Sequence, residues 1–352
     1  MRFCSTPVES DRLKLPLQSV DASHFRIAVQ RLHTLFKIYA HCCPVPLPAP
    51  GLIITPEIRN QCECYLPIAE VTAPFYRLYR SALNYAPILS STPFHKALSW
   101  ADVFVTLPPN VRFSANPAQI LEALCADHTL LTEFLFASFL PSRFYNGFGR
   151  YPRQREFVRR WLKGRNMELV RCLDAACGTG EGAYDLAFML AELGFSPEDV
   201  HIDGWTLDPL EVWSAVTRRF PHDRRREMEL IKNTSPLMEK GYLRRMVFSC
   251  RDILMPASPS DFPESGKQRR FDIILCNGLL GGPILHEKEE LELVVSNLAE
   301  LLAPGGILLA ADSFHGGWKQ KYPQSELRAL FEKNCLNPFE AGEGVGGLKP
   351  DQ

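Results

Sequence analysis

A glycine-rich loop after a short apolar segment constrains the fold of this chain more than any other feature. Residues 169–173 are mostly apolar and predict a buried β-strand, and the run Asp174-Ala-Ala-Cys-Gly-Thr-Gly-Glu181 follows it directly. Gly178 and Gly180 have no Cβ, so the backbone there can turn tightly and approach a ligand. Because open α/β sheets bind ligands at the carboxyl ends of their strands, this loop predicts a ligand site in a parallel sheet.

The segments after this loop alternate between strand and helix patterns. The apolar runs that predict strands are 201–207, 244–249, 271–276 and 307–311, and the patterns that predict helices are 182–193, about 210–220, 287–302 and 325–333. This alternation predicts an α/β domain with a doubly wound, Rossmann-like sheet. Only one further strand, near 335–340, is evident after the fifth strand, so we expect the sheet to lack its final antiparallel hairpin.

The first part of the chain has a different pattern. Apolar residues at helical spacing predict one helix over 25–42 and one or two more within 56–89. Asn116-Pro117 is a favourable helix start, and we expect that helix to continue to Leu140. The first twenty residues show no pattern, and we expect no regular structure there. We therefore expect an N-terminal, mainly α-helical domain at 1–142 and a Rossmann-like domain at 143–352.

Bulk properties argue against several classes of protein. The formal net charge is −1 at pH 7, so nothing indicates nucleic acid or an anionic membrane as a partner. No apolar run is long enough to span a bilayer, and we expect no membrane insertion. No secretory signal precedes the cysteines, which predicts reduced thiols and a cytoplasmic protein. Cys42, Cys43, Cys62 and Cys64 lack a proper Cys-x-x-Cys knuckle, so we expect buried thiols rather than a metal site.

Polar residues follow the later strands as well. Asp208 ends the second strand, where a carboxylate could bond the ribose hydroxyls of an adenosine cofactor, or it could be a turn residue before Pro209. Asp252 follows the third strand, where it could accept from an adenine amino group while Ile253 packs on the ring; a plain loop carboxylate is the alternative. Asn277 ends the fourth strand, beside the cleft or bonded to local backbone.

Together with the loop residues Asp174, Ala176, Gly178 and Gly180, these features resemble the class I methyltransferase pattern, which implies S-adenosyl-L-methionine as the cofactor. The run Thr179-Gly-Glu-Gly-Ala-Tyr-Asp-Leu-Ala-Phe-Met-Leu190 further resembles the loop and helix of the chemotaxis receptor methyltransferases. Phe148-Gly-Arg-Tyr-Pro-Arg-Gln-Arg-Glu-Phe157 is similar to that family's segment before the domain. The resemblance implies O-methylation of glutamate side chains on a chemoreceptor. It also implies cofactor roles at Asn146, Arg150, Glu181, Asp252 and Ile253.

A glutamate acceptor is already ionised at neutral pH, so its methylation needs no general base. An oriented Arg or Tyr beside the acceptor carboxylate would help instead, and Arg150 and Tyr145 are the first candidates for this catalytic role. Asp174 and Glu181 have a plainer alternative, as a cap and a first-turn acid of the following helix. Arg150 has one too, as the partner of a nearby acid.

The chain departs from the chemotaxis family in three places. No Tyr follows Asn277, the family's second-strand acid falls nearer Thr206, and residues 217–247 look helical where the family has a small β-subdomain. Two alternatives stay open for these reasons. One is a small-molecule methyltransferase whose helical domain forms a lid, and the other is a protein that binds cofactor or a partner without turnover. An NAD enzyme fits poorly, because Ala183 stands at the third glycine of Gly-x-Gly-x-x-Gly.

Overall fold

The computed structural model describes residues 17–86, 92–140, 147–257, 270–282, 284–311 and 321–351, together with the backbone of 2–4. The chain divides into two compact units. The first, which we call the sheet unit, comprises Met1–Leu13, Arg143–Arg219 and Glu229–Gln352. The second, the helical unit, comprises Lys14–Ser142 and Phe220–Met228.

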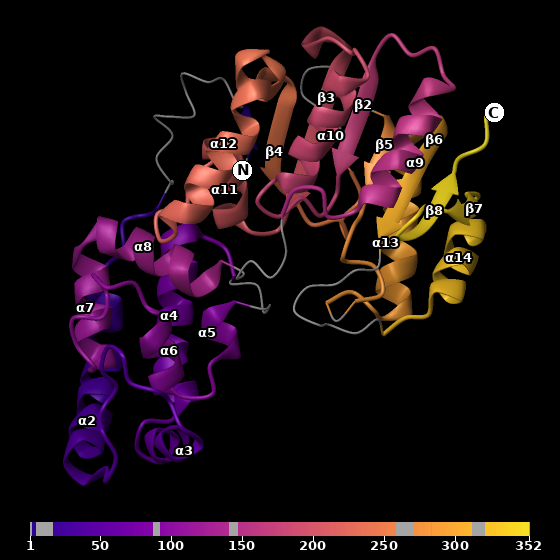
Figure 1. The fold of residues 1–352 in the computed structure, drawn as a ribbon. Helices are drawn as coiled ribbons and strands as arrows, with labels where there is room; N and C mark the ends of the chain where they lie inside the picture. The colour runs from indigo at the N-terminus through magenta and orange to yellow at the C-terminus, as the bar shows by residue number, and fades with distance from the viewer. Residues whose placement is uncertain are drawn as a thin grey trace. The chain divides into compact units, whose positions relative to one another are not determined.

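The helical unit is built from helices, which Figure 1 shows in indigo to magenta. Aromatic side chains from several of them pack together in its core. In chain order these are η1 (Ala22–Phe25), α2 (Arg26–Cys42), α3 (Pro56–Tyr65), α4 (Ile68–Leu83), α5 (Pro93–Lys96), α6 (Trp100–Thr106), α7 (Pro117–Ala126) and α8 (His128–Phe139). Phe75 lies at the centre, with its ring centroid 5.3 Å from that of Phe134 and 6.0 Å from that of Trp100. Across the described residues, no helix combines the length and the apolar character needed to cross a bilayer.

Two expectations for this unit are corrected. The helix that begins after Asn116 ends at Ala126, because Asp127 is extended and its carboxylate accepts the N–H groups of Thr129 and Leu130 to start a new helix. The cysteines expected to be buried thiols are mixed. Cys62 is buried, Cys43 is intermediate, and the other two, Cys42 and Cys64, are exposed.

The sheet unit contains an eight-stranded sheet in the order β1-β4-β3-β2-β5-β6-β8-β7. The strands are β1 (Arg2–Cys4), β2 (Val170–Asp174), β3 (Val200–Thr206), β4 (Met246–Cys250), β5 (Phe271–Leu275), β6 (Leu302–Ala311), β7 (Asn337–Glu340) and β8 (Gly344–Leu348). The five strands β2 to β6 are mutually parallel, which confirms the predicted doubly wound α/β sheet. The expectation of no regular structure in the first twenty residues is wrong, since β1 pairs antiparallel with β4.

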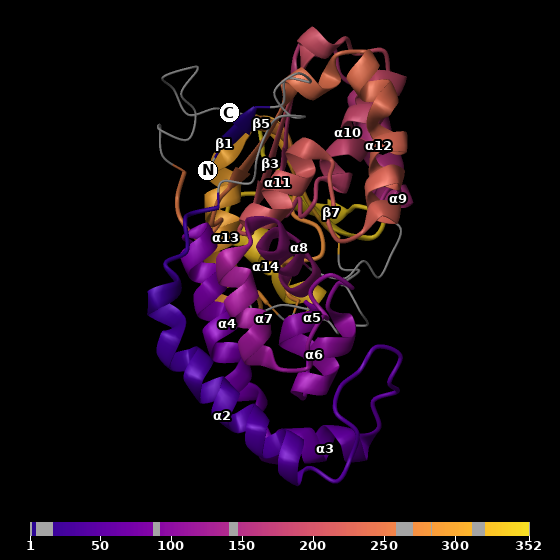
Figure 2. The ribbon, with the colours of Figure 1, turned by 90° about the vertical axis from the view of Figure 1, so that its left-hand side faces the viewer.

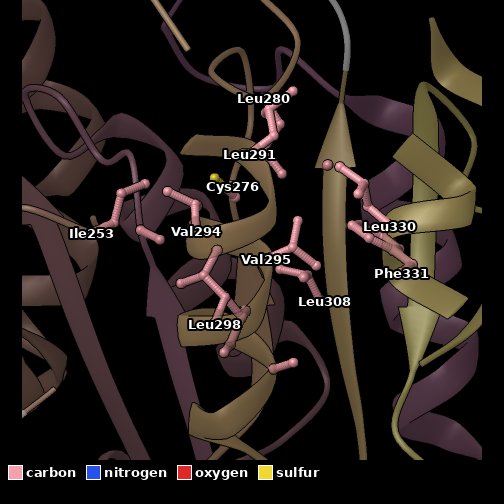
Figure 3. Packing of buried hydrophobic residues seen from close by; sticks show 14 of the residues in the cluster. Ile253, Cys276, Leu280, Leu291, Val294, Val295, Leu298, Leu308, Leu330 and Phe331 are labelled. Atoms are coloured by element: carbon pink, nitrogen blue, oxygen red, sulfur yellow. The ribbon is translucent and has the colours of Figure 1, made fainter. Parts of the chain in front are cut away.

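Helices cover both faces of this sheet (Figure 2). They are α9 (Pro152–Lys163), α10 (Glu181–Glu192), α11 (Pro209–Thr217), α12 (Arg224–Glu239), α13 (Lys288–Leu301) and α14 (Gln324–Lys333), with the short η2 (Pro197–Asp199) and η3 (Tyr242–Arg245). On one face, Val294, Val295 and Leu298 of α13 pack toward Leu308 of β6, with Phe331 of α14 beside them (Figure 3). Burying these side chains supplies the apolar contact that holds the helices to the sheet.

The prediction that the sheet lacks its final hairpin is wrong. β7 and β8 form that hairpin, and β8 pairs antiparallel with β6. Its sequence, Gly-Val-Gly-Gly-Leu, has little strand propensity, which is why the pattern was not evident. The glycines are required by packing instead. A Cβ at Gly344 would overlap the Ala310 carbonyl oxygen, and one at Gly346 would overlap the ring of Phe339.

Candidate cofactor site

The predicted loop lies at the carboxyl end of the central strand β2 and is shaped by one buried carboxyl group. Asp174 is only 4% exposed and accepts the backbone N–H groups of Ala176 and Ala183. It thereby ties both sides of the loop to the end of β2. Gly178 and Gly180 have φ values of 53° and 93°, left-handed conformations that favour glycine. The loop therefore takes a backbone path that these two glycines permit.

Burial makes the Asp174 carboxyl hard to ionise. Loss of hydration raises its pKa to about 7, and the negative charges of Glu181 and Asp185 add to the rise. The pKa of Asp185 is itself raised to about 6, chiefly by burial. Glu181 lies close by in the first turn of α10 and accepts a hydrogen bond of 2.6 Å from the Thr179 hydroxyl. The loop and the start of α10 thus concentrate three carboxyl groups in one place.

Asp208, predicted as the strand-end carboxylate, has a local role in the structure. It is 3% exposed and caps α11 by accepting the Leu210 N–H at 2.9 Å. Its neighbour Glu211, in the first turn of α11, is the residue that reaches the glycine loop. One Glu211 oxygen lies 3.8 Å from the position of a Cβ at Gly178, and the other accepts the Thr206 hydroxyl.

Sequence reasoning missed Glu211, although a signal for it exists. An N-cap Asp or Ser followed three residues later by Glu is the usual spacing of a capping box, and Asp208 and Glu211 have this spacing. Such spacing places the glutamate in the first turn, on the side of the strand end. The carboxylate that reaches the loop from the end of β3 is therefore Glu211, three positions after the predicted Asp208.

The residues after β4 lie at the same edge of the sheet, because parallel strands share their carboxyl ends. An Asp252 carboxylate oxygen accepts the Leu254 N–H at 2.9 Å and closes a turn. Ile253 is 9% exposed and belongs to the apolar cluster around α13, where Figure 3 labels it. The Asn297 amide donates to the Ile253 carbonyl oxygen at 2.9 Å, which fixes this turn against α13.

Both the oxygen and the nitrogen of the Asn277 side-chain amide are hydrogen-bonded to other protein groups. Its Oδ1 accepts from Gln154 Nε2 at 3.0 Å and from the Ala311 backbone N–H at 2.9 Å. Its Nδ2 donates to Gln154 Oε1 at 2.8 Å. Asn277 was expected to bond either ligand or local backbone, but its recorded partners are distant in the sequence, the main one being a side chain 123 positions earlier.

The segment before α9 carries the remaining predicted residues. The Arg150 guanidinium lies 5.0 Å from the ring centroid of Tyr151, a cation–π distance. Tyr145 and Asn146 lie outside the described residues. The structure therefore brings Asp174, Ala176, Gly178, Gly180 and Glu181 together with the newly found Glu211.

Comparison with known proteins gives structural likeness only. No family model matches the chain, and no curated protein matches it. One similar solved structure is a TehB-like SAM-dependent methyltransferase from Corynebacterium glutamicum, 14% identical, covering 56% of this chain and 85% of its own, with a TM-score of 0.34. Another is a SAM-bound amino pentose methyltransferase from Micromonospora echinaspora, 15% identical, covering 59% and 98%, with a TM-score of 0.37.

A third is the N-methyltransferase NodS from Bradyrhizobium japonicum in complex with S-adenosyl-L-homocysteine, 15% identical, covering 64% of this chain and all of its own, with a TM-score of 0.36. The fold itself is defined by the sheet. Numbered without β1, the strand order is 3-2-1-4-5-7-6, and β8 runs antiparallel to both of its neighbours, an arrangement typical of the class I SAM-dependent methyltransferase fold. Helices α2 to α8 precede β2 in the chain, as predicted, although the strand β1 of the same sheet comes before them.

The raised pKa of Asp174 predicts a pH-dependent stability that Asp174→Asn removes. The folded protein keeps a proton that the unfolded chain releases above its ordinary pKa of 3.8. The free energy of unfolding should therefore fall, by on the order of 2–4 kcal/mol, as the pH rises from about 4 to about 8. Asn carries no charge, so this part of the slope should vanish in urea denaturation at a series of pH values. Parallel slopes in both proteins would contradict the assignment.

Proposed function

We propose that the sheet unit is an S-adenosyl-L-methionine-dependent methyltransferase whose cofactor lies over the loop between β2 and α10. The observation that carries this proposal is the set of carboxyl groups around a glycine loop at the carboxyl end of β2: Asp174, Glu181, Asp185 and Glu211. S-adenosyl-L-methionine carries an ammonium and a sulfonium cation. Binding two cations lowers the energy of carboxylates that otherwise repel one another.

Individual roles follow from position. We infer that Glu211 accepts hydrogen bonds from the ribose hydroxyls, because its carboxylate reaches the loop from the second strand's side while Asp208 caps α11. The backbone of Ala176, Gly178 and Gly180 allows close approach of the cofactor. Asp252 and Ile253 supply the adenine side. Arg150, with Asn146 as a second group, fits the cofactor carboxylate, a role that rests on the family resemblance.

The fold of residues 217–247 supports one class of methyl acceptor over the other. In the chemotaxis family this region holds a small β-subdomain, whereas here α12 and η3 occupy it and the next strand is β4. We therefore favour a small-molecule acceptor over a chemoreceptor glutamate. The second candidate, a protein glutamate, rests on the resemblance at the loop and at 148–157, where Arg150 and Tyr145 would face the acceptor carboxylate.

Methyl transfer is an in-line displacement, in which the acceptor's lone pair forms the new bond to carbon as the carbon–sulfur bond breaks. The cofactor brings the reactive group, and the chain's task is to bind and orient. Carboxylates near the sulfonium would favour the cofactor over S-adenosyl-L-homocysteine, which keeps the ammonium but has lost the sulfonium charge. The acidic loop would in this way support both cofactor capture and product release.

Calorimetric titration tests the cofactor. We expect the wild type to bind S-adenosyl-L-methionine and S-adenosyl-L-homocysteine saturably. We expect Glu211→Gln to weaken binding of both roughly 10- to 100-fold, because the charged group that accepts the two ribose hydroxyl protons is lost. Asp174→Ala should weaken it at least as much, since the loop loses its anchor. Glu239→Gln, on the exposed end of α12, is the matched control and should bind as the wild type does.

A folded wild type that binds neither ligand would overturn the proposal. A different outcome, tight binding that Glu211→Gln leaves unchanged, would remove Glu211 from the ribose site and return that role to Asp208. The cofactor assignment itself would then stand.

The acceptor class can be tested with the methyl-labelled cofactor and a cell extract separated by size. We expect label in the fraction below about 1 kDa and little in protein. Label that enters protein and is released by mild alkali, as a carboxyl methyl ester is, would favour the protein glutamate instead. Glu211→Gln controls for transfer by other enzymes. A chain that binds cofactor and labels neither fraction fits the binding protein without turnover.

A further inference from the structure

A short segment before α9 lies against the first turns of α10. We call residues 147–151 the strap. A Cβ at Gly147 would lie 2.6 Å from Glu181 Cγ, so the strap packs directly on that side chain. The Gly149 N–H donates to the Asp185 carboxylate at 2.5 Å. Two of the carboxyl groups in the proposed cofactor site are therefore in contact with the strap.

The strap is anchored at its far end by a buried pair of amides. Gln154, in the first turn of α9, is 3% exposed and exchanges two hydrogen bonds with Asn277 at the end of β5. Asn277 is fixed in turn by the Ala311 N–H at the end of β6. The first turn of α9 is thus tied to two parallel strands at the edge of the sheet that carries the loop.

A carboxylate from the C-terminal hairpin completes the anchor. Glu343, in the turn between β7 and β8, accepts the Arg153 N–H at 2.9 Å and the Gln154 N–H at 2.6 Å. A carboxylate on the free N–H groups of a helix start forms charge-assisted bonds and matches the helix dipole. Gly342 allows this approach, because a Cβ there would lie 2.6 Å from Arg153 Cβ.

On the side that faces the groove beside α9, the described residues do not enclose the strap in apolar packing. A groove of about 560 Å³ opens beside α9, and its lining includes Gly149, Pro152 and Leu193. The strap borders this open space, so its position depends on the polar anchor more than on enclosed apolar contacts. The anchor consists of hydrogen bonds, which are directional and can therefore fix the position of the strap.

We propose that Gln154, Asn277 and Glu343 are positioning residues that hold the strap against Glu181 and Asp185 and thereby set cofactor affinity. This inference rests on the proposed function, because it concerns the same cofactor site. It gives Asn277 a role through Gln154 rather than through contact with the ligand. It also gives the C-terminal hairpin a task at the cofactor site, which it reaches through Glu343.

Two variants test the proposal by different routes. Gln154→Leu removes the amide pair, and Glu343→Gln keeps the size of the side chain while removing its charge. We expect each to weaken binding of S-adenosyl-L-homocysteine roughly 5- to 50-fold in calorimetry below the unfolding temperature. Hydrogen exchange at the Gly149 amide, measured without ligand, should be faster in both variants because the strap is released.

Asn334→Leu is the matched control. Asn334 donates to the Leu330 carbonyl oxygen at 2.8 Å at the end of α14, in the same unit but in no contact with the strap or its anchor that the described residues record. It should lower stability and leave affinity unchanged. If Gln154→Leu and Glu343→Gln are folded and bind as the wild type does, the positioning role is wrong, whatever their unfolding temperatures. If the wild type binds no ligand but Gly149 exchange still responds, the anchor exists and the proposed function fails.

Discussion

The buried carboxyl of Asp174 is the constraint on which the site depends. It sits at the end of the central strand, accepts backbone N–H groups from both sides of the loop, and is almost fully removed from water. A Cβ at Gly182 would lie 2.5 Å from its Oδ2, so the helix α10 begins as close to the carboxyl as a glycine allows. The position of α10, and with it Glu181 and Asp185, follows from this one turn.

The same arrangement is electrostatically unfavourable without a ligand. Burial and mutual repulsion raise the pKa of Asp174 to about 7 and that of Asp185 to about 6. Because such a cluster costs stability, a chain selected only for stability would avoid it. Carboxyl groups with strongly shifted pKa values are concentrated at functional sites. A cationic ligand relieves the repulsion, so the feature that destabilises the empty protein also favours binding.

Local sequence patterns predicted the elements whose conformation depends mainly on residues close together in the sequence. The glycine loop, the alternation of strands and helices, and the Asn116-Pro117 helix start could all be read directly. Asp127 was missed because an apolar run on both sides of it hid an N-cap. The final hairpin was missed because its glycines serve packing against Ala310 and Phe339, partners that no local pattern reveals.

The site was predictable only in part for the same reason. Asp174 and the loop glycines follow from the motif. The capping-box spacing after Asp208 indicates Glu211 in the first turn of α11, but its approach to Gly178 depends on how α11 packs. The Gln154–Asn277 pair joins residues 123 positions apart, and Glu343 reaches Gln154 across 189. Contacts of this kind are created by the order of strands in the sheet, and a single sequence contains no period or motif that encodes them.

Hydrogen exchange across the whole chain, with and without saturating S-adenosyl-L-homocysteine, tests the cofactor site most directly. We expect slower exchange in peptides covering 174–185 and 206–212, and in the strap at 147–151. We expect no change in α13 and α14, whose packing cluster Figure 3 shows. Protection confined to other parts of the chain, or no protection at a concentration that saturates calorimetric binding, would contradict a cofactor site on this loop.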